Sequence, residues 1–188
     1  MKKVFLFFSM IFSFGVLIAQ QGSAYPPLDK SPMDMSYFPG NYPLLKIQGK
    51  ITEPLDARVI YSRPQKSFRT IFGELVEYGK VWRLGANEAT ELDLFRHVRI
   101  GGKRLPKGRY TLYAIPYESK WTIIVNKDTD TWGAFKYDPK KDIVRVDVPV
   151  EKNSEVTDAL TMIFEKRVDG ANLVIAWDNL RIALPIIF

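Results

Sequence analysis

The sequence predicts an all-β protein: an antiparallel β-sandwich of about eight or nine short strands, with one or two short helical turns. Three observations support this prediction. Apolar and polar residues alternate at every second position in most of the chain after residue 56. Turn-forming pairs separate these runs at intervals typical of a sandwich. Helical periodicity is almost absent.

The N-terminal residues have the layout of a secretory signal peptide. Lys2 and Lys3 precede an apolar run at 4–19, and small residues follow at 22–24. The run is shorter than the roughly 20 residues that a membrane-spanning helix needs. We therefore expect residues 1–24 to be a cleaved signal. The mature protein would then be periplasmic or extracellular, without a stable membrane span.

The remainder divides into two parts. Residues 25–45 are rich in proline, which favours an extended N-terminal arm over a helix or a central strand. Residues 46–188 are expected to form a single β-sandwich domain, because nothing in their composition marks a linker. The chain has 188 residues, of which 46% are hydrophobic, enough for a sizeable core.

Period-two patterns place the expected strands in order. The strands lie at 57–61, 90–95, 98–100, 109–116, 121–126, 143–150, 160–166, 173–177 and 180–187. Gly101-Gly102 is a two-residue hairpin signal, and the polar break at 117–120 makes its flanking strands a second hairpin. Asp169-Gly170 and Asp178-Asn179 are expected to break the last three strands.

Two segments lack this alternation and are expected to form single helical turns, 71–76 and 154–159. The alternation also predicts which side chains face the core. Those expected to be mostly buried are Tyr110, Leu112, Trp121, Ile123, Val146 and Trp177.

Composition excludes several classes of function. The chain has no cysteine, which excludes disulfides, thiolate metal sites and cysteine nucleophiles. His97 is the single histidine, which excludes multi-histidine metal sites, and no cofactor is expected. The net charge is +6, but Lys and Arg are spread along the chain, so no nucleic-acid partner is expected.

The segment 79–90 is the strongest candidate for a binding site. It combines an aromatic ring with hydrogen-bonding groups, a combination that suits the apolar face and polar edges of a sugar. Its candidate residues, together with Arg63, are Trp82, Arg83, Asn87, Glu88 and Thr90. Gly85 can reach positive φ and Asn87 tolerates it, so a loop with a defined shape is expected rather than a linker. The alternative is structural: Arg83 pairs with Glu88 while Trp82 fills the core.

Several motifs resemble one family of exported bacterial proteins. They are Tyr61-Ser62-Arg63-Pro64, Ile71-Phe72-Gly73, Tyr78-Gly79-Lys80-Val81-Trp82-Arg83, Gly85-Ala86-Asn87-Glu88-Ala89-Thr90, Gly101-Gly102-Lys103, Leu105-Pro106-Lys107-Gly108-Arg109-Tyr110, Asn126-Lys127-Asp128, Trp132-Gly133-Ala134 and Tyr137-Asp138. From about Lys50 onward the chain is similar to domain of unknown function 2911, common in Bacteroidetes. The resemblance implies export and a β-rich domain, and it supplies no catalytic residues.

Three other groups of polar residues favour ordinary structural roles. Glu91 and Asp93 alternate with leucines, so they are expected on a solvent-facing side of a strand. His97 is expected at the surface at a strand end. The segment 126–130 lacks the glycine and glutamate of a calcium loop, and is expected to form a polar turn.

Two functions remain open. The first is a non-catalytic module that binds a carbohydrate or a cell-envelope ligand through the loop Trp82–Thr90 and Arg63. The second is a carboxylate-dependent hydrolase that uses Glu88. A hydrolase needs a second positioned acid or base, and Glu91 is expected to face away from Glu88. Binding is therefore the leading hypothesis, and no catalytic residue is assigned.

Overall fold

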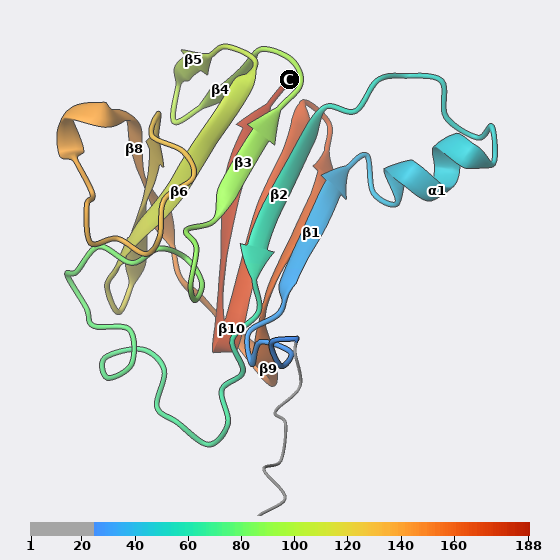
Figure 1. Ribbon diagram of the computed structural model, residues 1–188. Coiled ribbons are helices and arrows are strands. Elements are labelled where there is room, and N and C mark those ends of the chain that lie inside the picture. The colour runs from blue at the N-terminus through green and yellow to red at the C-terminus, as the bar shows by residue number, and fades with distance from the viewer. Residues whose placement is uncertain (1–24) are drawn as a thin grey trace, which may run out of the picture.

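Two antiparallel β-sheets face each other, as Figure 1 shows, in a computed structural model that describes residues 25–188. The strand orders are β1-β2-β3-β6-β7-β8 and β5-β4-β10-β9. The sheets meet where β9 packs on β1 and β2 and where β10 packs on β8. The predicted all-β class is confirmed. The expected signal peptide lies outside the described residues, among which no helix is long and apolar enough to cross a membrane.

The six-stranded sheet is formed by strands from both halves of the chain. Its strands are β1 (Met33–Phe38), β2 (Ala57–Ser62), β3 (Glu91–Leu94), β6 (Gly108–Pro116), β7 (Lys120–Asn126) and β8 (Asp142–Pro149). β6 and β7 form the expected hairpin, in which Leu112 lies opposite Val125. Between β2 and β3 the chain runs through a long loop at 63–90, which crosses the lower part of Figure 1.

The four-stranded sheet combines one short and one long hairpin. Its strands are β4 (Val98–Ile100), β5 (Lys103–Leu105), β9 (Glu151–Arg167) and β10 (Gly170–Ile187). Gly101 and Gly102 both adopt positive φ, as the predicted turn requires. The break expected at Asp178-Asn179 is wrong. Asp178 has a φ of 56° and the register shifts on both sides of it, so a β-bulge bends a continuous β10.

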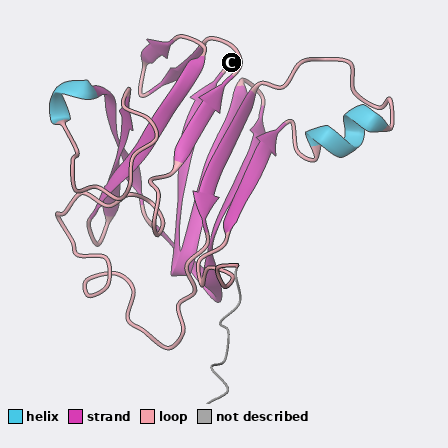
Figure 2. Ribbon diagram, viewed as in Figure 1, coloured by secondary structure: helices cyan, strands magenta, loops and turns pink. Residues whose placement is uncertain are grey.

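The helical turns are not where the sequence predicted them. The segment 154–159 lies within β9, and 71–76 is a turn closed by a backbone bridge between Phe72 and Val76. Within residues 25–188 the helices are instead α1 (Tyr42–Ile47) and the 3₁₀ turn Pro139–Lys141. Figure 2 shows α1 projecting away from the sheets, and none of its residues is buried.

The segment predicted as an extended arm contributes a strand to the sheet. Met33–Phe38 form β1 and pair with β2 along their whole length, from Met33 opposite Ser62 to Phe38 opposite Ala57. β1 is an edge strand, the position in which flanking prolines are tolerated. The proline content had also predicted no helix before residue 46, and α1 corrects that expectation.

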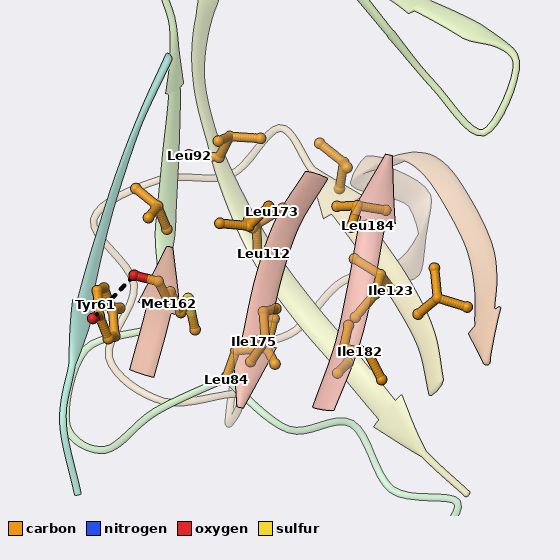
Figure 3. Packing of buried hydrophobic residues seen from close by; sticks show 14 of the residues in the cluster. Tyr61, Leu84, Leu92, Leu112, Ile123, Met162, Leu173, Ile175, Ile182 and Leu184 are labelled. Carbon is orange, nitrogen blue, oxygen red and sulfur yellow. Dashed lines mark hydrogen bonds between the residues drawn. The ribbon is translucent and has the colours of Figure 1, made fainter. Parts of the chain in front are cut away.

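The main core fills the space between the sheets, as Figure 3 shows. The six-stranded sheet contributes Leu92, Leu112 and Ile123, and the four-stranded sheet contributes Met162, Leu173, Ile175, Ile182 and Leu184. Tyr61 donates a hydrogen bond to the carbonyl oxygen of Met162 (3.3 Å). Of the side chains predicted to be buried, Tyr110, Leu112, Trp121, Ile123 and Trp177 are buried, whereas Val146 is only half-buried.

A second, smaller cluster covers the part of the outer face of the six-stranded sheet that β6 and β7 form. Tyr113 on β6 and Ile124 on β7 are buried there with Ala89, against half-buried Ala134 and Tyr137. Both faces of β6 and β7 are therefore covered near their centre. The covering segment, 127–141, lies beside the end of the loop that contains the candidate site residues.

Candidate functional site

Trp82 belongs to an aromatic cluster in the core. Its ring stacks on Trp177, with centroids 6.0 Å apart, and meets Trp121 and Phe72 edge-on at 5.8 and 6.2 Å. The side chain is only 8% exposed, and its Nε1 donates to the carbonyl oxygen of Gly85 (3.2 Å). Its ring therefore contacts aromatic neighbours rather than an open surface, as the structural alternative predicted for this residue.

The loop is shaped by Leu84 and Asn87, which have φ of 55° and 58°. Asn87 thus adopts the positive φ that its residue type tolerates, whereas Gly85 does not. Gly85 is needed for close packing, because a Cβ there would lie 2.7 Å from Oγ of Ser62. That hydroxyl bonds both the N–H and the C=O of Ala86 at 2.6 Å, which fixes the loop to the end of β2.

Arg63 and Thr90 hold parts of the fold together. Arg63 donates to the carbonyl oxygen of Leu160 (3.2 Å), to Asp34 (3.1 Å) and to Thr161 (3.0 Å), and so connects β1, β2 and β9. Thr90 is buried, and its hydroxyl donates to the carbonyl oxygen of Leu84 (2.7 Å). Both side chains therefore have structural partners.

Arg83 and Glu88 point to different sides of the loop. No ion pair joins them within residues 25–188; Glu88 is exposed and Arg83 is half-buried. Arg83 lines a cavity of about 180 Å³ with Trp82, Trp177 and Arg69. Its Nε is shielded from water and has no hydrogen-bond partner. Burial lowers the pKa of the Arg83 guanidinium below its ordinary value.

Glu88 lines a separate cavity of about 190 Å³ together with Glu91 and Asp130. The expectation that Glu91 faces away from Glu88 is therefore wrong. Both oxygens of Glu91 have a partner, however: Oε2 accepts from Arg109 (2.6 Å) and Oε1 accepts from the backbone N–H of Asp130 (2.8 Å). Arg109 also contacts Asp130 at 2.8 Å. Glu88 is the carboxylate of this cavity that has no side-chain partner within the described chain.

Two exposed aromatic residues beside Glu88 were not predicted as site residues. Trp132 and Phe135 are 62% and 84% exposed, and both line a cavity of about 370 Å³. Asp128 and Lys136 also line it, while Asp130 and Thr131 line both this cavity and that of Glu88. The sequence offered one signal for this site: Trp132 and Phe135 lie in a polar segment that has no strand-like alternation, so no strand would bury them.

Backbone bonds place these aromatics next to the loop. The N–H of Gly133 donates to the carbonyl oxygen of Asn87 (2.9 Å), and the N–H of Ala89 donates to that of Thr131 (3.0 Å). We call the surface formed by Glu88, Asp130, Thr131, Trp132 and Phe135 the aromatic surface. It brings a carboxylate without a side-chain partner to the edge of an open aromatic cavity.

The remaining polar groups are placed as follows. Asp93 is 5% exposed, so its expected solvent-facing position is wrong: it accepts from Arg58 on β2 at 2.6 Å, and neighbouring strands cover it. His97 is exposed, as expected. In 126–130 the N–H of Asp128 donates to the Asn126 side chain (2.9 Å), which forms a polar turn. Among residues 25–188 no three acidic or histidine side chains are close enough to hold a metal ion.

A comparison with protein-family models identifies the relatives of this chain. The model of a protein of unknown function, DUF2911, matches residues 43–186. The chain belongs to this family. The resemblance seen in the sequence motifs is therefore confirmed. No curated protein and no solved structure matches the chain.

The DUF2911 match includes all the candidate residues and the whole aromatic surface. It begins at residue 43, after β1, so three residues close to the candidate sites precede it. These are Ser31 in the cavity of Arg83, Met33 in the cavity of Glu88, and Asp34, which accepts from Arg63. The walls of both cavities thus extend beyond the DUF2911 match.

Proposed function

We propose that this DUF2911 protein is a non-catalytic module that binds a carbohydrate, or a sugar-containing ligand of the cell envelope, at the aromatic surface. The exposure of Trp132 and Phe135 around a cavity of about 370 Å³ is the observation that carries the proposal. Exposed aromatic groups beside polar groups mark binding sites on soluble proteins. A pyranose ring can stack on such a ring while its hydroxyls bond to carboxylates.

The site differs from the one expected in the sequence. Glu88 remains part of it, and Asn87 supports it through its carbonyl oxygen, which accepts from the N–H of Gly133. Trp82 packs in the core and Arg83 faces a different cavity. The aromatic group that would stack on a sugar is therefore Trp132 rather than Trp82.

A hydrolase that uses Glu88 is the alternative. Glu91 lines the same cavity, which brings a second carboxylate to the site. Both of its oxygens already accept hydrogen bonds, from Arg109 and from the backbone of Asp130. These bonds hold the Glu91 side chain against Arg109 and the backbone of Asp130, whereas a second acid or base must reach a substrate bound at Glu88. The engagement of Glu91 supports binding over hydrolysis.

We further propose that the protein acts outside the cytoplasm, since residues 1–24 have the pattern of a cleaved signal. Mass spectrometry of the native protein should find a new N-terminus between residues 20 and 25. Recovery of intact Met1 in the membrane fraction would contradict export by a cleaved signal.

The binding proposal is tested by titrating bacterial envelope oligosaccharides and measuring heat. Trp132→Ala should weaken binding roughly tenfold or more, because it removes the stacking surface. Phe68→Ala is a matched control: Phe68 is fully exposed but lines neither cavity of the aromatic surface, so its loss should leave the affinity unchanged. Equal affinity in wild type and Trp132→Ala would contradict the proposal.

Glu88→Gln separates binding from hydrolysis. The amide keeps the shape of the side chain and one accepting oxygen, so a binding carboxylate should lose only part of its affinity. Products released by the wild type and abolished in Glu88→Gln would establish the hydrolase alternative instead.

A further inference from the structure

The cavity beside Arg83 is a second candidate site, independent of the aromatic surface. Its polar lining is cationic: Arg69 and Arg83, with the hydroxyl of Ser31, and no acidic residue contributes to its walls. Its apolar lining includes the rings of Trp82 and Trp177. A small organic anion has a charged group and an apolar part. A cavity that offers cationic side chains for the first and aromatic rings for the second suits such a ligand.

Arg83 has no protein group that neutralises its charge. The guanidinium is half-buried, its Nε is shielded without a partner, and no ion pair involves it within the described chain. Burial alone lowers its pKa, and no carboxylate opposes that effect. A buried charge without a partner is costly. An anion in the cavity would offset this cost.

The acidic residues around this cavity do not line it. Glu74 and Glu77 flank its residues Leu75 and Val76, and both are exposed. Glu88 lines the other cavity, beyond the turns made by Leu84 and Asn87. Asp178 accepts from Lys66 at 2.6 Å. Arg69 donates through Nε to the carbonyl oxygen of Lys66 (3.0 Å) and through Nη2 to that of Gln65, and these bonds hold its guanidinium in place. The loop thus places two cations at one cavity, and no carboxylate lines that cavity.

We propose that this cavity binds the carboxylate of a small organic acid, with the charged end at Arg83 and Arg69 and the carbon chain against Trp82 and Trp177. The planar guanidinium fork matches a carboxylate. The volume of about 180 Å³ is below the 300–1,000 Å³ of larger ligand sites, so the ligand is a short acid or one acidic substituent. The apolar wall disfavours inorganic sulfate, which has no apolar part to bury.

The test uses tryptophan fluorescence in a Trp132→Phe background. That substitution removes the exposed indole and leaves Trp82, Trp121 and Trp177, which all belong to the core cluster. Sodium butyrate, acetate and sulfate are titrated against sodium chloride at equal ionic strength. Butyrate should give a saturable change, acetate a weaker one, and sulfate no more than chloride. Because Trp132 is absent, failure of this test is separate from failure of the carbohydrate proposal.

Arg83→Met should weaken butyrate binding roughly tenfold or more, because it removes the cation. Its melting temperature should not fall, because the wild-type charge is unpaired. Lys80→Met is the matched control: Lys80 is exposed in the same loop, and its loss removes one positive charge without altering the cavity. If Arg83→Met does not fold, Arg69→Met provides the same comparison at an exposed residue.

Three outcomes would overturn the proposal. They are no saturable response to butyrate, an unchanged response in the arginine variants, and a response to sulfate equal to that to butyrate.

Discussion

At the scale of single residues, Asp93 shows how neighbouring strands decide the environment of a charge. β3 lies between β2 and β6, and each contributes an arginine near this carboxylate. Arg58 donates at 2.6 Å, and Nε of Arg109 lies 3.9 Å away. The Asp93 side chain is only 7% exposed, whereas that of Arg58 is 33% exposed. The pair is thus buried on one side and open to water on the other.

Removal of this carboxylate should destabilise the fold. We expect Asp93→Ala to lower the free energy of unfolding by roughly 2–3 kcal/mol, below the 3–5 kcal/mol of a fully buried pair because Arg58 keeps access to water. Asp147→Ala is the control, since its pair with Lys120 is half exposed on both sides and should contribute little. Urea unfolding measures the free energy of unfolding of both variants. An equal decrease in Asp93→Ala and Asp147→Ala would contradict the burial of Asp93.

At the scale of elements, the segment 127–141 depends on contacts that follow no sequence period. Its backbone bonds to Asn87 and Ala89, and Tyr137 packs edge-on against Tyr113 with centroids 5.1 Å apart. The Tyr137 hydroxyl donates to Asp142 (2.5 Å). These contacts hold Trp132 and Phe135 at the surface, because the opposite side of the segment is packed on β6 and β7.

Tyr137 should make this segment sensitive to alkaline pH. Burial, and then the hydrogen bond to Asp142, raise its pKa from 10.0 to about 12. The folded state therefore holds the proton more tightly than the unfolded state, so the stability from this group is complete below pH 10 and lost as the pH rises toward 12. Wild type should lose more stability than Tyr137→Phe between pH 10 and pH 12 in urea unfolding, after each is referenced to its value at pH 8. Parallel curves would contradict this assignment.

The same elements show what the sequence could and could not predict. Alternation predicted the β6–β7 hairpin, and Gly101-Gly102 predicted the turn before β5, because both signals are local. Which strands are covered on both faces depends on the segment 127–141, whose position no local pattern encodes. Trp132 was therefore not expected at a site. Asp93 was expected in water because its contacts with Arg58 and Arg109 come from strands distant in the sequence. The resemblance to the family was confirmed because it rests on successive motifs.

At the scale of the whole molecule, side chains of the loop at 63–90 pack in the core between the two sheets and contact both. Ile71 and Leu84 are fully buried in the main core. The centroid of the Phe72 ring lies 4.9 Å from that of Trp121 on β7 and 6.3 Å from that of Trp177 on β10. The loop thus contributes core side chains that neither sheet supplies. The position of Arg83 at its cavity follows from this packing.

Loss of the Phe72 ring should therefore weaken the whole fold. We expect Phe72→Ala to cost roughly 2–3 kcal/mol, below the 3–5 kcal/mol of a fully buried ring because Phe72 is half-buried. Phe68→Ala, in the same loop, should leave the melting temperature unchanged, since that ring is entirely exposed. Calorimetry distinguishes the two, and a small loss in Phe72→Ala would show that the loop is dispensable for the core.

The pairing of β1 with β2 has a consequence for how the protein can be shortened. A chain begun at residue 43 would keep every position of the family match, yet it would leave the N–H and C=O groups of β2 unpaired along an open edge. It would also leave Arg63 without Asp34, and both cavities without one wall. Such an edge is a template for pairing between molecules. The shortened chain should therefore aggregate through β2 and lose both proposed ligands together.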